Sequence, residues 1–195
     1  MSSISAYFDI HQSFPFYGAY HKEWRNILVH VIGVPTLFTT GMYFFTHLKL
    51  IPDTQAVGLP ANLPLFGNSI SVGDFLFSLY TISFYFMEPV AAALYTPFLI
   101  GMHQIANSTL QGQASLAIGL HVIAWIAQFI GHGVFEGRKP ALLDSFFQSI
   151  HAAVFFVWLE VLFYFGYRPA LQKELEHEMK QFAAKENNSK KKKDL

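Results

Sequence analysis

Histidine is the residue type in this sequence best suited to chemistry. Nine histidines occur in 195 residues that are 52% hydrophobic, and several lie within or beside long apolar runs. An imidazole in such surroundings needs a partner for its ring nitrogens, and neutral imidazole is a common metal ligand. Because the chain has no cysteine, disulfides and thiolate ligands are excluded. A metal held by nitrogen and oxygen here would be iron, copper, manganese or zinc.

The first group of candidate residues surrounds the start of the first apolar run. At about 100° per residue, Asn26 and His30 share one helix face. His21 precedes His30 by nine residues, so the two would point to opposite sides of one continuous helix. We therefore expect His21 to precede the helix and to fold back. A polar residue at the membrane interface is the alternative interpretation of His21.

The second group lies along the third apolar run. His121, Gln128, His132 and Glu136 follow one another at steps of seven, four and four, which places them near one stripe of a helix. Trp125 falls beside this stripe. A polar seam between helices would explain Gln128, since histidine and glutamine hydrogen-bond between membrane helices. Two histidines and a glutamate on the same stripe favour a metal site instead.

Other polar groups within apolar runs give weaker signals. His151 opens the last apolar run and Glu160 lies on the opposite helix face, so one of them, but not both, could complete a site. Glu88 precedes a proline and is either a proton relay or a helix-break partner. The remaining histidines without partners at useful spacing are interpreted as interfacial or solvated, namely His11, His47 and His177.

The elements that must position these residues are apolar helices. Mean hydropathy is +0.31 and only 13% of residues are charged, which indicates one integral membrane unit with the lipid bilayer as its partner. Four stretches approach or exceed the roughly 20 residues that a span requires, at 27–46, 72–102, 115–134 and 145–167. The second stretch contains Glu88-Pro89 and Thr96-Pro97, so it is one kinked helix or a tight hairpin. We expect an all-α polytopic bundle of four to five spans.

Four spans with both termini in the cytosol are the favoured arrangement, although the histidines create a tension with it. His30 lies near the start of the first span and His132 near the end of the third stretch. The two can meet at one membrane face only if the chain crosses an even number of times between them, which requires a hairpin at 72–102. Shallow or broken helices meeting at mid-depth are the alternative.

The C-terminal region is expected to form a separate part of the chain. We predict a membrane domain over 1–169 and a cytosolic amphipathic helix with a lysine-rich tail over 170–195. Lys192 and Lys193 match the dilysine retrieval signal of endoplasmic-reticulum membrane proteins, which coat proteins recognise. A solvated charge run is the alternative. Lysine excess near the last span also favours a cytosolic C-terminus. Because no basic face with interleaved aromatics exists outside this tail, nucleic-acid binding is not expected.

Two motif blocks together are specific enough to indicate a family. They are His21-x4-Asn26-x3-His30-x2-Gly33-x-Pro35 and His121-x3-Trp125-x2-Gln128-Phe129-Ile130-Gly131-His132-x3-Glu136-x3-Pro140-Ala141-Leu142. The sequence over most of 17–168 resembles the fungal endoplasmic-reticulum 2-hydroxy fatty acid dioxygenases, whose relatives were long described only as a domain of unknown function.

The resemblance implies an iron(II)-dependent enzyme of fatty acid α-oxidation. Its substrates would be O2 and 2-hydroxy fatty acids, including those formed from phytosphingosine, and its products CO2 and an acid one carbon shorter. Catalytic and metal-binding roles would fall to His21, His30, His121 and His132. We expect Asn26, Gln128, Glu136 and His151 to orient these ligands. Arg25 or Arg138 would lie near the substrate head group.

Two other functions remain open on the sequence. One is a non-enzymatic lipid-binding or assembly protein of the membrane, in which the histidines only join helices. The other is a di-iron lipid hydroxylase, which is weakened because neither HxxxH nor HxxHH occurs in the chain. A zinc hydrolase with an HExxH pair is likewise not indicated.

Overall fold

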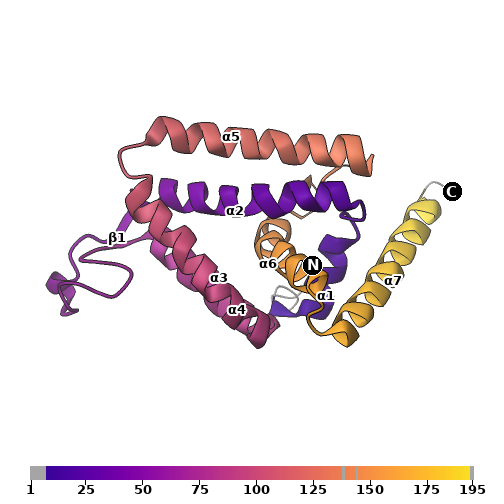
Figure 1. Cartoon of the computed structure of the whole chain (residues 1–195), viewed down its shortest axis with the longest axis horizontal. Helices are drawn as coiled ribbons and strands as arrows, with labels where there is room; N and C mark the ends of the chain where they lie inside the picture. The colour runs from indigo at the N-terminus through magenta and orange to yellow at the C-terminus, as the bar shows by residue number, and fades with distance from the viewer. Residues whose placement is uncertain (1–7, 138, 144, 194–195) are drawn as a thin grey trace. The chain divides into compact units, whose positions relative to one another are not determined.

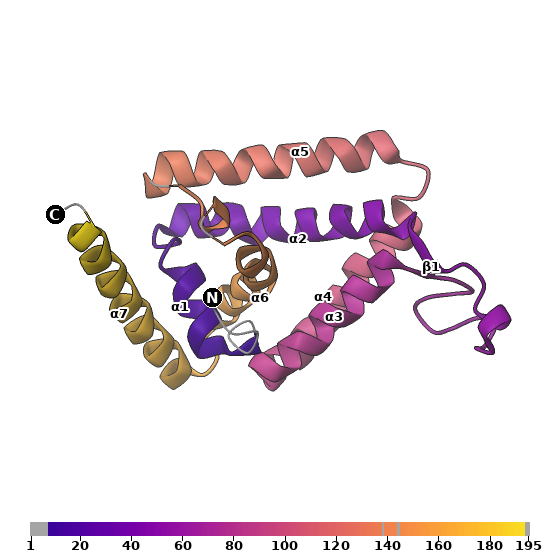
Figure 2. The same cartoon turned by 180° about the vertical axis from the view of Figure 1, so that it is seen from behind.

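Helices make up most of the computed structural model (Figures 1 and 2), as expected for the all-α class. The structure describes residues 8–137, 139–143 and 145–193, without the side chains of residue 141 and residues 186–193. Short 3-10 and π-helical turns are labelled η. The elements in chain order are α1 (Ile10–Gly18), α2 (Trp24–Thr46), β1 (Lys49–Ile51), η2 (Gln55–Val57), β2 (Ile70–Ser71), α3 (Val72–Met87), α4 (Pro89–Gln104), η3 (Ile105–Thr109), α5 (Ala114–Gly131), η4 (His132–Glu136), η5 (Ala141–Leu143), α6 (Phe146–Tyr164) and α7 (Pro169–Lys193).

The chain divides into two compact units. The first contains residues 1–32 and 128–195, and the second contains residues 33–127. Helices α2 and α5 contribute residues to both. The contacts place α7 in the same unit as α1 and α6. The predicted division at residue 170 between a membrane domain and a cytosolic helix stays a prediction.

In the first unit, α1 packs against both α6 and α7. Its aromatic side chains form the core, with the Phe14 ring 4.8 Å from Phe156 and the Tyr17 ring 4.7 Å from Phe156. Helix α7 comes so close to α1 that a Cβ atom on Gly18 would lie 2.6 Å from Cε of Met179. The Met179 side chain therefore fills the space that Gly18 leaves on α1.

In the second unit, α3 and α4 form the hairpin that was one of two possibilities for stretch 72–102. The break is at Glu88, which ends α3 and caps α4 by accepting a hydrogen bond from the Ala91 amide. Glu88 is thus a helix-break partner. At the other end of the hairpin, buried Asp74 on α3 contacts buried His103 on α4 through Oδ1 and Nε2, 2.7 Å apart. In the segment between α2 and α3, strand β1 pairs with β2 in antiparallel fashion.

Three helices of the described chain are long and apolar enough to cross a membrane, namely Trp24–Thr46, Ala114–Glu136 and Phe146–Tyr164. Large apolar side chains on them are exposed, such as Ile32 at 67% and Ile123 at 65%, which supports membrane association. The expected count of four to five spans is not confirmed. Helices α3 and α4 have 16 residues each, about 24 Å at 1.5 Å per residue, which falls short of the hydrocarbon core of about 30 Å.

Candidate metal centre

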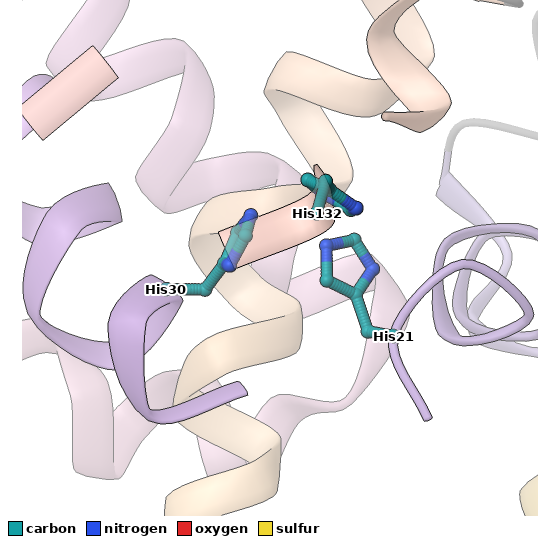
Figure 3. Close-up of side chains that lie close together, drawn as sticks. All are labelled: His21, His30 and His132. Atoms are coloured by element: carbon teal, nitrogen blue, oxygen red, sulfur yellow. The ribbon is translucent and has the colours of Figure 1, made fainter. Parts of the chain in front are cut away.

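Three histidines distant in the sequence meet inside the first unit. His21 precedes α2, His30 lies in its second turn and His132 opens η4. Figure 3 shows the three side chains turned toward one another. The ring centroids are 4.5 Å apart for His21 and His30, 4.7 Å for His21 and His132, and 4.9 Å for His30 and His132. Their exposed fractions are only 2%, 2% and 3% in chain order. All three side chains of this histidine cluster are therefore buried.

His21 reaches the cluster because the chain turns back after α1, as its spacing predicted. The turn is closed by hydrogen bonds from the Tyr20 and His21 amides to the carbonyls of Tyr17 and Gly18. The His21 ring stacks on the Tyr17 ring at 4.1 Å and 11°. Burial raises the pKa of the Tyr17 phenol, so that ring stays neutral beside the cluster.

Backbone carbonyls fix the tautomers of two cluster members. Nδ1 of His21 lies 2.8 Å from the Tyr17 carbonyl oxygen, and Nδ1 of His30 lies 2.9 Å from the Asn26 carbonyl oxygen. A carbonyl only accepts, so in both rings Nδ1 carries the proton and Nε2 carries the lone pair. This is the arrangement by which proteins orient metal-binding histidines.

Glu136 ties the segment that bears His132 to the segment that bears the other two histidines. Its Oε1 atom accepts hydrogen bonds from the amides of Lys22 and Glu23 at 2.8 and 2.9 Å, and from Nδ2 of Asn26 at 3.2 Å. The carboxylate therefore caps the N-terminus of α2, where amides lack helical partners and negative charge is favourable. The link is local to the cluster because His132 and Glu136 bound one π-helical turn.

Asn26 and Gly131 complete this connection. Asn26 is fully buried, and its carbonyl orients His30 while its amide group binds Glu136. A Cβ atom on Gly131 would lie 2.5 Å from Oδ1 of Asn26. The glycine directly before His132 is thus required for α5 to end against the asparagine. Asn26 and Glu136 thus both lie beside the histidine cluster, and their role in orienting metal ligands stays a prediction.

The donor set suits a transition metal. One ligand nitrogen from each cluster member lies within 4.8 Å of the other two. Imidazole nitrogen is a good ligand for iron, zinc, copper and nickel and a poor one for calcium or magnesium. Three buried rings at this separation repel one another when protonated, so neutral lone pairs facing a cation are the favourable state. The cluster therefore fits a divalent transition metal.

His121, expected as a fourth ligand, is not part of this cluster. It lies in the second unit, where its Nδ1 is 2.8 Å from Oγ1 of Thr40 and its Nε2 accepts a hydrogen bond from the Trp125 indole at 3.1 Å. The Thr40 hydroxyl donates to the Thr36 carbonyl, so Nδ1 of His121 is the donor to Thr40. Both ring nitrogens are thus engaged within its own unit.

The other residues expected to orient ligands or bind substrate are more dispersed. Gln128 is buried one turn before His132, and its Nε2 has no hydrogen-bond partner among the described residues. His151 lies on α6 with its ring edge-to-face with Phe8 at 6.0 Å. Arg25 is exposed, pairs with Glu23 at 3.2 Å and lies over the Phe135 ring. Arg138 and the side chains of Lys192 and Lys193 lie outside the described residues.

A cavity beside the cluster was not foreseen from the sequence. Its volume is about 400 Å³, and His21 is one of its walls. The side chains that line it come from α1, α2, α6, α7 and the segment before α2, and they are Phe14, His21, Lys22, Ile27, Glu160, Phe163, Gln172, Glu176, Met179 and Lys180. The sequence predicted α7 only as a cytosolic amphipathic helix, and nothing local in it indicated that the helix would pack against α1.

These features define a membrane-associated helical protein with a buried three-histidine centre. The chain belongs to the family described as 2-hydroxy-palmitic acid dioxygenase Mpo1-like, whose family model matches residues 7–165. The 2-hydroxy-palmitic acid dioxygenase MPO1 of Saccharomyces cerevisiae is 32% identical over 171 residues, covering 88% of this chain and 90% of the yeast protein. The resemblance inferred from the two motif blocks is thereby confirmed. No solved structure matches the chain.

Proposed function

We propose that this protein is an iron(II)-dependent 2-hydroxy fatty acid dioxygenase. The reaction converts a 2-hydroxy fatty acid and O2 into the acid one carbon shorter, CO2 and water, and it balances without an external reductant. The observation that carries the proposal is the buried cluster of His21, His30 and His132 in a chain whose yeast relative is named as a 2-hydroxy-palmitic acid dioxygenase.

Iron would be held by Nε2 of His21, Nε2 of His30 and a ring nitrogen of His132. Iron(II) supplies the one-electron chemistry through which O2 reacts with organic substrates, and non-haem iron oxygenases keep positions open for substrate and O2. The protein's own contribution is positional. The carbonyls of Tyr17 and Asn26 hold two rings in the ligating tautomer, Glu136 and Asn26 hold the segments together, and burial excludes water.

The cellular setting is part of the same proposal. We place the protein in the endoplasmic-reticulum membrane as a multi-pass protein with a cytosolic C-terminus, retrieved by coat proteins through Lys192 and Lys193. Its substrates would include 2-hydroxy fatty acids derived from phytosphingosine. The lysine-rich end of the sequence and its apolar helices support this setting.

A di-iron lipid hydroxylase is not favoured. Within the described chain, the buried group of potential ligands has only three histidines, whereas membrane di-iron hydroxylases use dense clusters of HxxxH and HxxHH motifs, and neither motif occurs in the sequence. A lipid-binding protein without catalysis is the remaining alternative. It needs no metal and no hydrogen-bonded fixing of the two histidine tautomers.

The decisive experiment combines metal content with turnover. The detergent-purified protein is loaded with iron(II) without oxygen and then given 2-hydroxypalmitate and O2, with no electron donor. We expect about one iron per chain and release of a 15-carbon acid. His132→Ala should lose both, while His177→Ala, a change at an exposed histidine of α7, should lose neither. Iron-loaded protein that consumes no O2 would sink the proposal, and dependence on an added reductant would favour the hydroxylase.

A further inference from the structure

We propose that the cavity beside the histidine cluster is the head-group site for the acyl substrate, with Lys22 and Lys180 as the groups that recognise its carboxylate. This inference rests on the proposed function. It assigns a binding role to α7, which the sequence indicated only as a cytosolic amphipathic helix.

The composition of the cavity fits an amphiphile with an anionic head. Phe14, Ile27, Phe163 and Met179 supply apolar walls, while the lysines, the glutamates and Gln172 supply polar ones. The volume of about 400 Å³ lies within the range of roughly 300–1,000 Å³ that is usual for small-molecule sites. Such a mixed lining suits the first carbons of a fatty acid together with its carboxylate and hydroxyl groups.

The position of the cavity fits the chemistry of a 2-hydroxy acid. The carbon that is oxidised is bonded directly to the carboxyl carbon, so the group that binds the carboxylate must adjoin the reacting centre. His21 belongs both to the cluster and to the cavity wall, and Lys22 is its neighbour in the chain. The Lys22 amide is fixed by Glu136, so the base of this side chain is held beside the cluster.

The two lysines are available to bind an anion. Among the described residues, no carboxylate lies within 4.0 Å of either ammonium group. Arg25, one of the two arginines expected near the head group, is instead paired with Glu23 and does not line this cavity. Lys22 and Lys180 are therefore the cations that a carboxylate in this cavity would meet.

Two carboxylates also line the cavity, so lysine and glutamate substitutions should change the affinity for the acid in opposite directions. Glu176 accepts a hydrogen bond within α7 from Gln172 at 3.0 Å, and Glu160 faces the same space from α6. A bound carboxylate is attracted by the lysines and repelled by an ionised glutamate. Lys180→Gln should weaken the binding of the acid, and Glu176→Gln should strengthen it. A purely structural role for α7 would not produce opposite signs.

Helix α7 is held as a wall by contacts in the two turns that precede Lys180. Leu175 is fully buried and Met179 lies against Gly18. At the outer edge, Nδ1 of His11 on α1 lies 3.1 Å from Oε2 of Glu178. Single substitutions at the exposed Lys180 and Glu176 leave these contacts in place, so the helix is expected to stay docked in the test variants.

The test measures equilibrium binding to full-length, metal-free protein in a fixed concentration of detergent. The probes are radiolabelled 2-hydroxypalmitate and its methyl ester, which has the same chain and no charge. Lys22→Gln and Lys180→Gln should each weaken acid binding about three- to tenfold, since the lysines are exposed, and should leave ester binding unchanged. Glu176→Gln should tighten acid binding by a similar factor. Lys173→Gln, on the same helix but outside the cavity, is the matched control.

The outcomes separate this inference from the proposed function. A wild-type protein that does not prefer the acid to the ester, or lysine variants that keep the wild-type preference, would overturn the assignment of the cavity. The same holds if Lys173→Gln equals Lys180→Gln. If acid binding follows the expected pattern but iron-loaded protein shows no turnover, the cavity assignment stands and the proposed reaction fails. If wild-type protein turns over and the KM values of the lysine variants do not rise, the reaction stands and the cavity assignment fails.

Discussion

Replacing Gly131 with alanine should test whether the position of Asn26 determines how the histidines of the cluster are arranged. The new Cβ atom would lie 2.5 Å from Oδ1 of Asn26, roughly 1 Å short of van der Waals contact. Asn26 is fully buried and bonded to Glu136 through Nδ2, so it cannot move without weakening that bond. Overpacking costs about 1–3 kcal/mol, and a weakened bond to a carboxylate adds about 1 kcal/mol.

Alanine is also the better helix former, which gives the experiment its control. Gly119 lies on the same helix with no atom within 4 Å of a built Cβ, so Gly119→Ala should stabilise the protein by about 0.4–1 kcal/mol. Gly131→Ala gains the same helix-propensity energy, but the overpacking and the weakened hydrogen bond of Asn26 cost more. The free energy of unfolding should therefore fall by about 1–3 kcal/mol. Chemical unfolding in detergent and cobalt(II) titration should show lower stability and weaker metal binding for Gly131→Ala only.

A double-mutant cycle shows whether the loss acts through the asparagine. Asn26→Ala removes the atom that clashes, so Gly131→Ala should be less damaging in that background, with a coupling free energy of about 1–2 kcal/mol. If Gly131→Ala is as stable as Gly119→Ala, or if the two substitutions at positions 26 and 131 are additive, the proposed contact does not determine the site.

Three further predictions concern other contacts. Glu136→Gln should weaken metal binding about 10–100-fold, whereas Glu23→Gln, at an exposed ion pair, should change it little; equal metal affinities for the two variants would contradict the capping role. His121→Ala should keep the iron stoichiometry of the wild type and lower only the unfolding midpoint, because its ring nitrogens bind Thr40 and Trp125; loss of iron would restore it as a ligand. Asp74→Ala should destabilise the α3–α4 hairpin by about 3–5 kcal/mol by leaving buried His103 without its carboxylate, and a circular-dichroism melt unchanged from wild type would refute that estimate.

Local patterns in the sequence predicted the features that depend on neighbouring residues. The nine-residue spacing of His21 and His30 required a chain reversal before α2, and the structure has it. Glu88-Pro89 required a break, and one occurs there. Gln128, His132 and Glu136 lie in one region because steps of four residues return to the same side of a helix.

Contacts between distant segments could not be predicted in this way. Periodicity places His121 and His132 on one stripe of a helix, but it does not say what each meets, and His121 meets Thr40 instead of the cluster. The apolar face of α7 is visible in the sequence, yet its partner α1 is more than 150 residues away in the chain. The number of membrane crossings stays a prediction as well. His30 and His132 meet, but helices α3 and α4 have only 16 residues each and fall short of ordinary spans.

The three histidines of the cluster come from segments separated by up to 111 residues, between positions 21 and 132. A cation bound by all three would therefore act as a cross-link that exists only in the folded chain. Its binding energy adds to the free energy of unfolding, by about 2.7 kcal/mol when the free metal exceeds its dissociation constant a hundredfold. In a metal-starved cell the protein would then lose folding stability as well as activity, so its abundance would depend on the metal supply.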